Sequence, residues 1–231
     1  HLDFNKFKKI KYFYLISLSS RARYLKRIYF SNSIMSSSKV SDNWYIDLPI
    51  LGWRPRKISN GFHSNNILKL ASRNLEFKGN KIPWENSYKD PEDTMALHRF
   101  GWLLNILVDN QEKLNLNNLL DFIEDWIFYH KDKNKSIEWE SYSVSERIVN
   151  WLLFLCAIKP HINIDDKRLS NIKNELLNHL KYLASNLEYR GEKTNNHIIN
   201  NARALYIGGR LLNVKFAEKI ALLIIKNETD R

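Results

Sequence analysis

The stretch from Ser143 to Ile158, SVSERIVNWLLFLCAI, indicates most directly which fold this chain adopts. Its first four residues have the capping-box pattern, in which a Ser and a Glu three residues later satisfy free N–H groups at a helix start. An apolar run over residues 148–158 follows, and Pro160 ends it because proline cannot continue a helix. We therefore predict a helix here that contributes to the core.

Helical patterns continue on both sides of this stretch. Apolar residues at helical spacing predict helices over residues 91–109, from about 118, from 165 to about 188, and over about 215–227. Their expected first residues or caps are Pro91, Asn117 or Asn118, and Asp165. The helix after Asp165 has an inward stripe, and Gly191 is expected to break it; the stripe is Leu169, Ile172, Leu176, Leu180 and Leu183.

Successive helices joined by short loops predict an all-α fold, either a helical-hairpin array or an incomplete (α/α) toroid. Only Trp44–Pro49 and Leu75–Phe77 have the composition of short strands or extended loops. The 231 residues are 44% hydrophobic and 26% charged, which suits a globular protein with a substantial core. No apolar run approaches the roughly 18 residues that a membrane span needs.

The net charge of +11 is concentrated at the N-terminus. Residues 1–60 contain twelve Lys and Arg but only three acids, so they carry +9 of it. Residues 4–30 predict a basic amphipathic helix or helix pair, which either packs on its own domain or makes a weak contact with a membrane surface. A Ser-rich linker over 31–43 follows. We therefore divide the chain into an arm and linker, 1–43, and a helical domain, 44–231.

Several chemistries lack their usual motifs. The single cysteine, Cys156, lies in the apolar run and is expected to be inert core. The sequence has no phosphate-binding glycine loop, no nucleophile elbow and no Cys/His spacing for a metal, and no nucleic-acid motif accompanies the basic arm. We expect no cofactor, no metal and no nucleic-acid partner. Gly208-Gly209 is expected to mark a close contact between helices.

The segment Thr194-Asn195-Asn196-His197 puts two amides and an imidazole at the expected start of a helix that ends near Asn213. A helix start offers unpaired N–H groups and a partial positive charge, so it favours anions. At 100° per residue, Asn196, Asn200 and Arg203 share one face, with His197 and Asn201 beside it, while a stripe of Ile198, Ala202, Leu205 and Leu212 faces the core. Two interpretations stay open: a simple cap by Thr194 or Asn195, or a carboxylate site.

Three blocks, in order, resemble the heparinase II/III-like polysaccharide lyases. They are Leu97–Leu103 (LHRFGWL), Trp139–Trp151 (WESYSVSERIVNW) and Asn195–Leu212 (NNHIINNARALYIGGRLL). The resemblance covers roughly residues 77–212. It implies an N-terminal α/α toroid, normally followed by an antiparallel β-sandwich, and β-elimination on a uronic-acid-containing polysaccharide of the heparin, heparan-sulfate or alginate type.

The resemblance also implies roles for the residues of these blocks. Asn196 would neutralise the uronate carboxylate and His197 would take part in proton transfer. The implied substrate contacts are Asn195, Asn200, Arg203, Trp139, Tyr142, Arg147 and His98. For the two arginines an ion pair with Glu146 or Glu188 is equally open, and His98 is expected to be structural rather than catalytic.

The chain departs from the family because the catalytic tyrosine and the sandwich expected downstream of the Asn-His helix are not in this sequence. We therefore expect an N-terminal fragment of a periplasmic or secreted lyase, carrying the carboxylate-neutralising part of its site. Two alternatives remain. One is a non-catalytic protein on the same toroid that binds acidic glycans or assists polysaccharide assembly. The other is a nucleic-acid or membrane-surface protein that acts through the basic arm.

Overall fold

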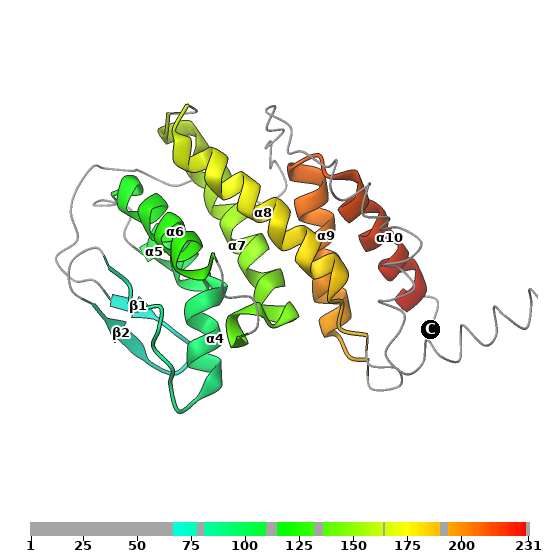
Figure 1. Ribbon diagram of the computed structural model, residues 1–231, viewed down its shortest axis with the longest axis horizontal. Helices are drawn as coiled ribbons and strands as arrows, with labels where there is room; N and C mark the ends of the chain where they lie inside the picture. The colour runs from blue at the N-terminus through cyan, green and yellow to red at the C-terminus, as the bar shows by residue number, and fades with distance from the viewer. Residues whose placement is uncertain are drawn as a thin grey trace, which may run out of the picture.

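The computed structural model describes residues 67–77, 81–109, 115–131, 136–163, 165–189 and 194–229. Within them the protein is built mainly from α-helices, which confirms the all-α prediction (Figure 1). The expected N-terminal arm, the Ser-rich linker and the segment Trp44–Pro49 lie outside these residues. In this part of the chain no helix combines the length and apolarity that crossing a membrane requires.

A small hairpin precedes the helices. Strands β1 (Ile67–Lys69) and β2 (Asn74–Glu76) pair antiparallel, with Leu68 opposite Leu75 and both side chains buried. β2 overlaps the short strand expected near Leu75. The buried carboxylate of Asp93 fixes the hairpin turn, because it accepts hydrogen bonds from the backbone N and the Oγ of Ser72 at 2.7 and 2.6 Å.

The single helix expected over residues 91–109 is two helices, α4 (Pro91–Arg99) and α5 (Gly101–Asp109). The chain breaks at Phe100, which has a left-handed backbone with φ 62°. Its fully buried ring lies 4.9 Å from the ring of Trp102 and 5.3 Å from that of Trp151. Packing of this aromatic ring therefore accompanies a backbone conformation that is unfavourable for most residues other than glycine.

The next three helices begin close to their expected positions but use different caps. α6 (Leu116–His130) is capped by Asn115, whose side chain accepts from the backbone N–H groups of Asn117 and Asn118. α7 (Ser141–Ile158) is capped by Glu140, so the Ser-Glu capping box predicted at 143–146 is wrong. α8 (Lys167–Ser185) is capped by Asp166. The stripe predicted along α8 is buried as expected.

The last two helices match the sequence closely. They are α9 (His197–Leu211) and α10 (Lys215–Thr229), and a left-handed Asn213 separates them. α8 ends before the expected 188, whereas α7 stops ahead of Pro160 as predicted. Two short 3-10 segments, η2 (Ile137–Trp139) and η3 (Lys159–His161), flank α7.

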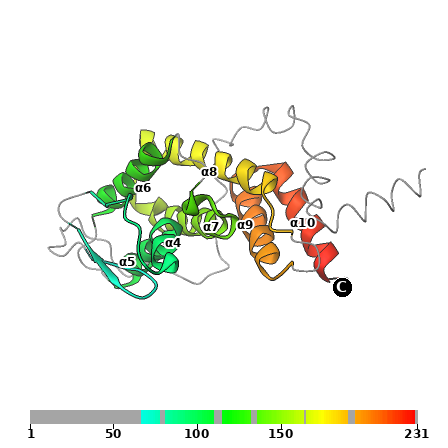
Figure 2. The same ribbon diagram turned by 60° about the horizontal axis from the view of Figure 1, so that its bottom comes forward.

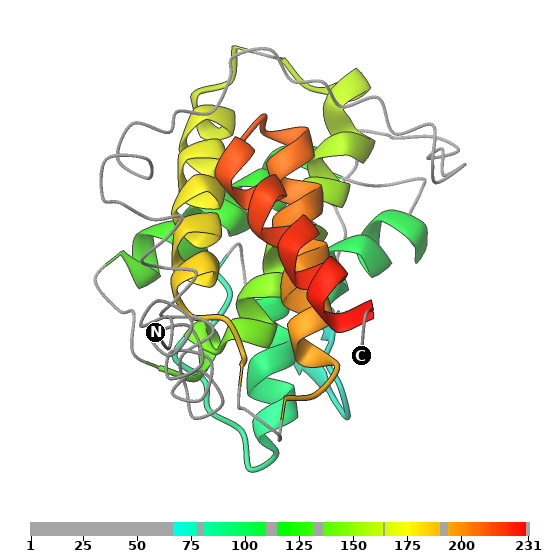
Figure 3. The ribbon, with the colours of Figure 1, turned by 90° about the vertical axis from the view of Figure 1, so that its right-hand side faces the viewer.

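Apart from α5, which contacts α4 and α7, the helices from α4 to α10 alternate between two rows. In one row α7 packs between α4 and α9, and in the other α8 contacts both α6 and α10. Figure 2 shows α4, α7 and α9 side by side with α6 and α8 over them. From the end of the molecule, α10 lies across α9 beside α8 (Figure 3). The N-terminal ends of α7 and α9 therefore belong to neighbouring helices of the same row.

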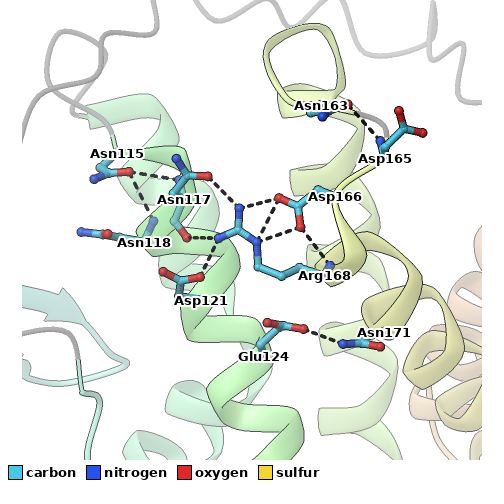
Figure 4. A network of polar contacts seen from close by, with 10 residues as sticks. All are labelled: Asn115, Asn117, Asn118, Asp121, Glu124, Asn163, Asp165, Asp166, Arg168 and Asn171. Carbon is cyan, nitrogen blue, oxygen red and sulfur yellow. Dashed lines mark hydrogen bonds and ion pairs between the residues drawn. The ribbon is translucent and has the colours of Figure 1, made fainter.

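Polar clamps fix α8 against α6. Arg168 donates to the side chain of Asp121 at 2.6 Å, to the side chain of Asn117 at 2.7 Å, and to its own cap Asp166 (Figure 4). One turn along, Asn171 donates to Glu124 at 2.7 Å. These contacts lie on the surface between the two helices and hold α8 against α6 within their row.

Gly208 and Gly209 lie at a close contact, as predicted. A Cβ on Gly208 would approach Leu180 of α8 to 2.7 Å, and one on Gly209 would approach the backbone N of Glu218 to 2.6 Å. Cys156 is half-buried against the core, and burial raises the pKa of its thiol to about 12. A thiol with this pKa is almost entirely protonated at neutral pH, in line with the expected inert role.

Candidate functional site

The start of α9 uses its two asparagines differently. The side chain of Asn195 accepts a hydrogen bond from the backbone N of His197 at 3.0 Å, so it caps the helix. Asn196 stands at the cap position without a side-chain capping bond, and it is exposed. The cap interpretation therefore applies to Asn195, and the amide of Asn196 is open to solvent beside the N–H groups of the first turn.

His197 lies between a carboxylate and an aromatic ring. Its Nδ1 is 3.2 Å from Oε1 of Glu188, and its ring centroid is 4.8 Å from that of Tyr142. The His197 side chain is 38% exposed, whereas that of Glu188 is only 7% exposed. The imidazole thus has one side open to solvent at the start of α9 and one nitrogen next to a buried carboxylate.

Asn201 lies inside the protein, although helical phase placed it beside the polar face. Its Oδ1 accepts from the backbone N of Glu188 at 3.0 Å, and its Nδ2 donates to Ser145 Oγ at 3.0 Å. Asn201 is fully buried because α9 packs closely on α7, and a buried amide requires such partners. It ties the segment that carries Glu188 to both helices.

The rim of this site contains Tyr142, Asn200 and two arginines that face acids. Arg203 donates to Glu146 at 2.6 Å, which is the ion pair that the sequence left open. Arg99 donates to Glu92 at 2.8 Å, and its guanidinium lies 4.9 Å from the centre of the Tyr142 ring. Asn200 is half-buried, and its Nδ2 is enclosed without a hydrogen-bond partner among the described residues.

Three of the expected substrate contacts, His98, Trp139 and Arg147, lie in the core instead. Arg147 has no exposed surface, and its guanidinium lies 4.2 Å from the centre of the Trp126 ring. It donates to the backbone oxygens of His98 and Glu138 at 2.9 and 3.0 Å. The interpretation of these residues as polymer contacts is corrected by their burial, since α7 turns Arg147 toward the inward face.

The surroundings of this buried arginine shift several pKa values. Burial lowers the pKa of Arg147 to about 9. Burial and the neighbouring His130 lower the pKa of His98 to about 3. Burial alone would raise the pKa of Glu138, but hydrogen bonds from His130 and Ser136 lower it to about 2. The core therefore contains an ionised glutamate beside a histidine that stays neutral.

His98, His130 and Glu138 also form a possible ligand set, with ligand atoms within 4.8 Å of one another. The Nε1–H of Trp126 donates to Nδ1 of His98 at 3.1 Å, which leaves the proton of a neutral His98 on Nε2. His130 Nδ1 lies 3.0 Å from the backbone oxygen of Trp126, so that nitrogen carries a proton. The hydrogen bonds thus leave His98 without a lone pair for a metal.

The site includes residues that sequence reasoning did not select. Glu140 caps α7 through hydrogen bonds from the backbone N–H groups of Tyr142 and Ser143, and Glu188 lies in the irregular segment that follows α8. The sequence named Glu188 only as a partner for an arginine, whereas it contacts His197. No spacing signals this contact, because it depends on how that segment returns past α7.

The structure therefore brings Asn195, Asn196 and His197 at the start of α9 together with Tyr142 on α7, and Asn200 and Arg203 follow on α9, where Arg203 pairs with Glu146. It separates them from His98, Trp139 and Arg147. Comparison with known proteins adds no relative: no family model matches the chain, and neither a curated protein nor a solved structure matches it significantly.

Proposed function

We propose that the start of α9 binds the carboxylate of a uronic acid in an acidic polysaccharide and takes part in β-elimination there. The observation that carries the proposal is the exposed amide of Asn196 next to an imidazole that Glu188 and Tyr142 contact. Neutral donors at a helix start suit a carboxylate whose negative charge grows during the reaction.

The chemistry gives each group a role. His197 takes the proton at C5, next to the carboxylate, and the electron pair of that C–H bond forms the C4–C5 double bond. The C4–oxygen bond breaks, and the leaving oxygen receives a proton from an acid, the role that the resemblance assigns to a downstream tyrosine. Asn196 stabilises the second negative charge on the carboxylate. Tyr142 offers a ring face to a sugar.

The arrangement of the helices is consistent with this function. α4, α7 and α9 form one row and α6, α8 and α10 another, as two concentric layers of an (α/α) toroid would. We propose that the rows belong to such a toroid, that the inner row faces the substrate, and that the protein acts in the periplasm or outside the cell. The partner is then the polysaccharide itself.

The test uses alginate, hyaluronan, heparan sulfate and heparin, with ultraviolet absorbance of the unsaturated uronate as the readout. For a protein that also carries the downstream tyrosine implied by the resemblance, we expect turnover of at least one polymer, and we expect Asn196→Ala and His197→Ala each to lower kcat by about 10²–10³-fold. Residues 1–231 alone should bind that polymer with little or no turnover. Tyr206→Phe, an exposed position on the same helix, is the matched control and should retain activity.

Binding of a polymer without product by a protein that carries the downstream tyrosine would contradict the lyase proposal, and strong turnover by residues 1–231 alone would contradict the expected fragment. If Asn196→Ala also weakened that binding, the result would support a non-catalytic glycan-binding protein. Neither binding nor product with any of the four polymers would refute the uronate site.

A further inference from the structure

We propose that Glu188, held in place by Asn201, is a positioning residue that fixes His197 with its proton on Nδ1 and leaves Nε2 as the base. The role of His197 as a base rests on the proposed function, whereas the contact between Glu188 and His197 does not depend on any substrate. The contact that carries it is the 3.2 Å separation of His197 Nδ1 and Glu188 Oε1. An ionised carboxylate only accepts hydrogen bonds, so Nδ1 must donate.

Asn201 contacts Glu188 on the side away from His197, through the backbone N and the Oε2 of Glu188. A backbone N–H only donates, so the atom of Asn201 that faces Glu188 N is its oxygen, and its Nδ2 faces Ser145 and Glu188. Asn201 Nδ2 lies 3.4 Å from Glu188 Oε2, and Ser145 Oγ in turn donates to the backbone oxygen of Ser141 at 2.8 Å. The donors from Asn201 Nδ2 through Ser145 Oγ to the Ser141 backbone oxygen thus point one way, from α9 into α7.

Two further features limit the movement of the imidazole. The Tyr142 ring lies against it, and Asn195 caps the backbone of His197 itself. With Glu188 on one nitrogen and the Tyr142 ring on one side, the ring cannot turn over without losing a buried partner. The nitrogen opposite Glu188 is therefore the one available to a substrate, and neutral histidine, which on its own favours a proton on Nε2, is held in the other form.

The same atoms have a second use that the geometry disfavours. Ligand atoms of Glu140, Glu188 and His197 lie within 4.8 Å of one another, which suits a divalent cation by distance alone. However, both oxygens of Glu140 accept backbone hydrogen bonds at the start of α7, at 3.0 and 2.8 Å. That carboxylate serves as a helix cap, and the proton on Nδ1 takes the place that a cation would need.

The test is nitrogen NMR of the whole chain with labelled histidine, recorded at alkaline pH, with His197→Gln to assign the signals. We expect wild-type His197 to be protonated on Nδ1. Glu188→Gln should shift the population toward the Nε2–H form. Glu146→Gln removes a rim carboxylate that pairs with Arg203 and not with His197, so this matched control should keep the wild-type pattern.

Wild-type His197 with its proton on Nε2 would overturn the proposal whether or not any variant folds. A folded Glu188→Gln protein with an unchanged His197 spectrum would also overturn it. Mn²⁺ that selectively broadens the His197 signals would assign the cluster to a cation instead and overturn it too. None of these readouts needs substrate, so a failure to cleave any polysaccharide would count against the proposed function alone.

Discussion

Arg147 illustrates at the level of one residue how an apparent ligand becomes part of the core. Its guanidinium lies over the rings of Trp126 and Trp139 at 4.2 and 5.4 Å, and it donates to two backbone oxygens. Its Nε and Nη2 have no partner among the described residues. A buried cation in this position is tolerated because indole faces and the carboxylates of Glu175 and Glu138 offset part of its desolvation.

Arg147→Met should therefore destabilise the protein by about 3 kcal/mol, because it leaves two buried carbonyls without a donor and removes a positive charge that interacts with Glu175 and Glu138. Arg203→Met is the matched control, since the side chain of Arg203 is 45% exposed and its pair with Glu146 is worth at most about 1 kcal/mol. Urea denaturation measures both. Equal losses in the two variants would contradict the structural role of Arg147.

At the level of elements, adjacent glycines of α9 face different neighbours. Gly208 faces the end of the Leu180 side chain, which can move, whereas Gly209 faces the backbone of Glu218 in α10, which cannot move without displacing that helix. The approach of α9 to α10 is thus set by one missing Cβ. This pairing also places α10 relative to the helix that carries His197.

Gly209→Ala should cost about 1–3 kcal/mol, because the clash with the α10 backbone exceeds the gain of up to about 1 kcal/mol that Ala brings to a helix. Gly208→Ala should change stability by less than that, since Leu180 can adopt another rotamer. The free energy of unfolding of the two variants, measured side by side, checks this order. A larger loss for Gly208→Ala would show that α8 and not α10 limits the packing.

At the level of the whole molecule, the buried polar core makes stability depend on pH. The pKa of His98 is about 3 in the folded protein against an ordinary 6.5, and burial also lowers the pKa of His179 well below 6.5. Below about pH 6.5 the unfolded chain binds protons at these histidines while the folded protein does not. The pKa of Glu138, about 2 against an ordinary 4.5, extends the loss to lower pH.

The free energy of unfolding should therefore fall as the pH drops from about 6.5, by about 1.4 kcal/mol per pH unit for each such histidine at most. Thermal or urea unfolding between about pH 7 and about pH 4 measures this slope. His98→Asn, whose amide oxygen can still accept from Trp126, should reduce it. A stability that stays flat over this range would contradict the neutral, buried state of His98.

The sequence predicts the part of the site that depends on helical periodicity, but not the contacts between elements. Helical phase placed Asn196, Asn200 and Arg203 on one face, and Asn195 was one of two expected caps. It placed Asn201 beside that polar face, whereas the close packing of α9 against α7 buries this residue. The sequence also gave no reason to expect a contact between Glu188 and His197, because contacts between different elements do not follow a fixed spacing in the sequence.

The sequence by itself determined the helices, most of their ends and the stripe of α8 that faces the core, because these depend on local propensity, capping and periodicity. Tertiary structure decided the break at Phe100, the burial of Arg147 and the contact of Glu188 with His197. Each of these depends on contacts between side chains of elements that are distant in the sequence. The local pattern of residue types carries no information about such contacts.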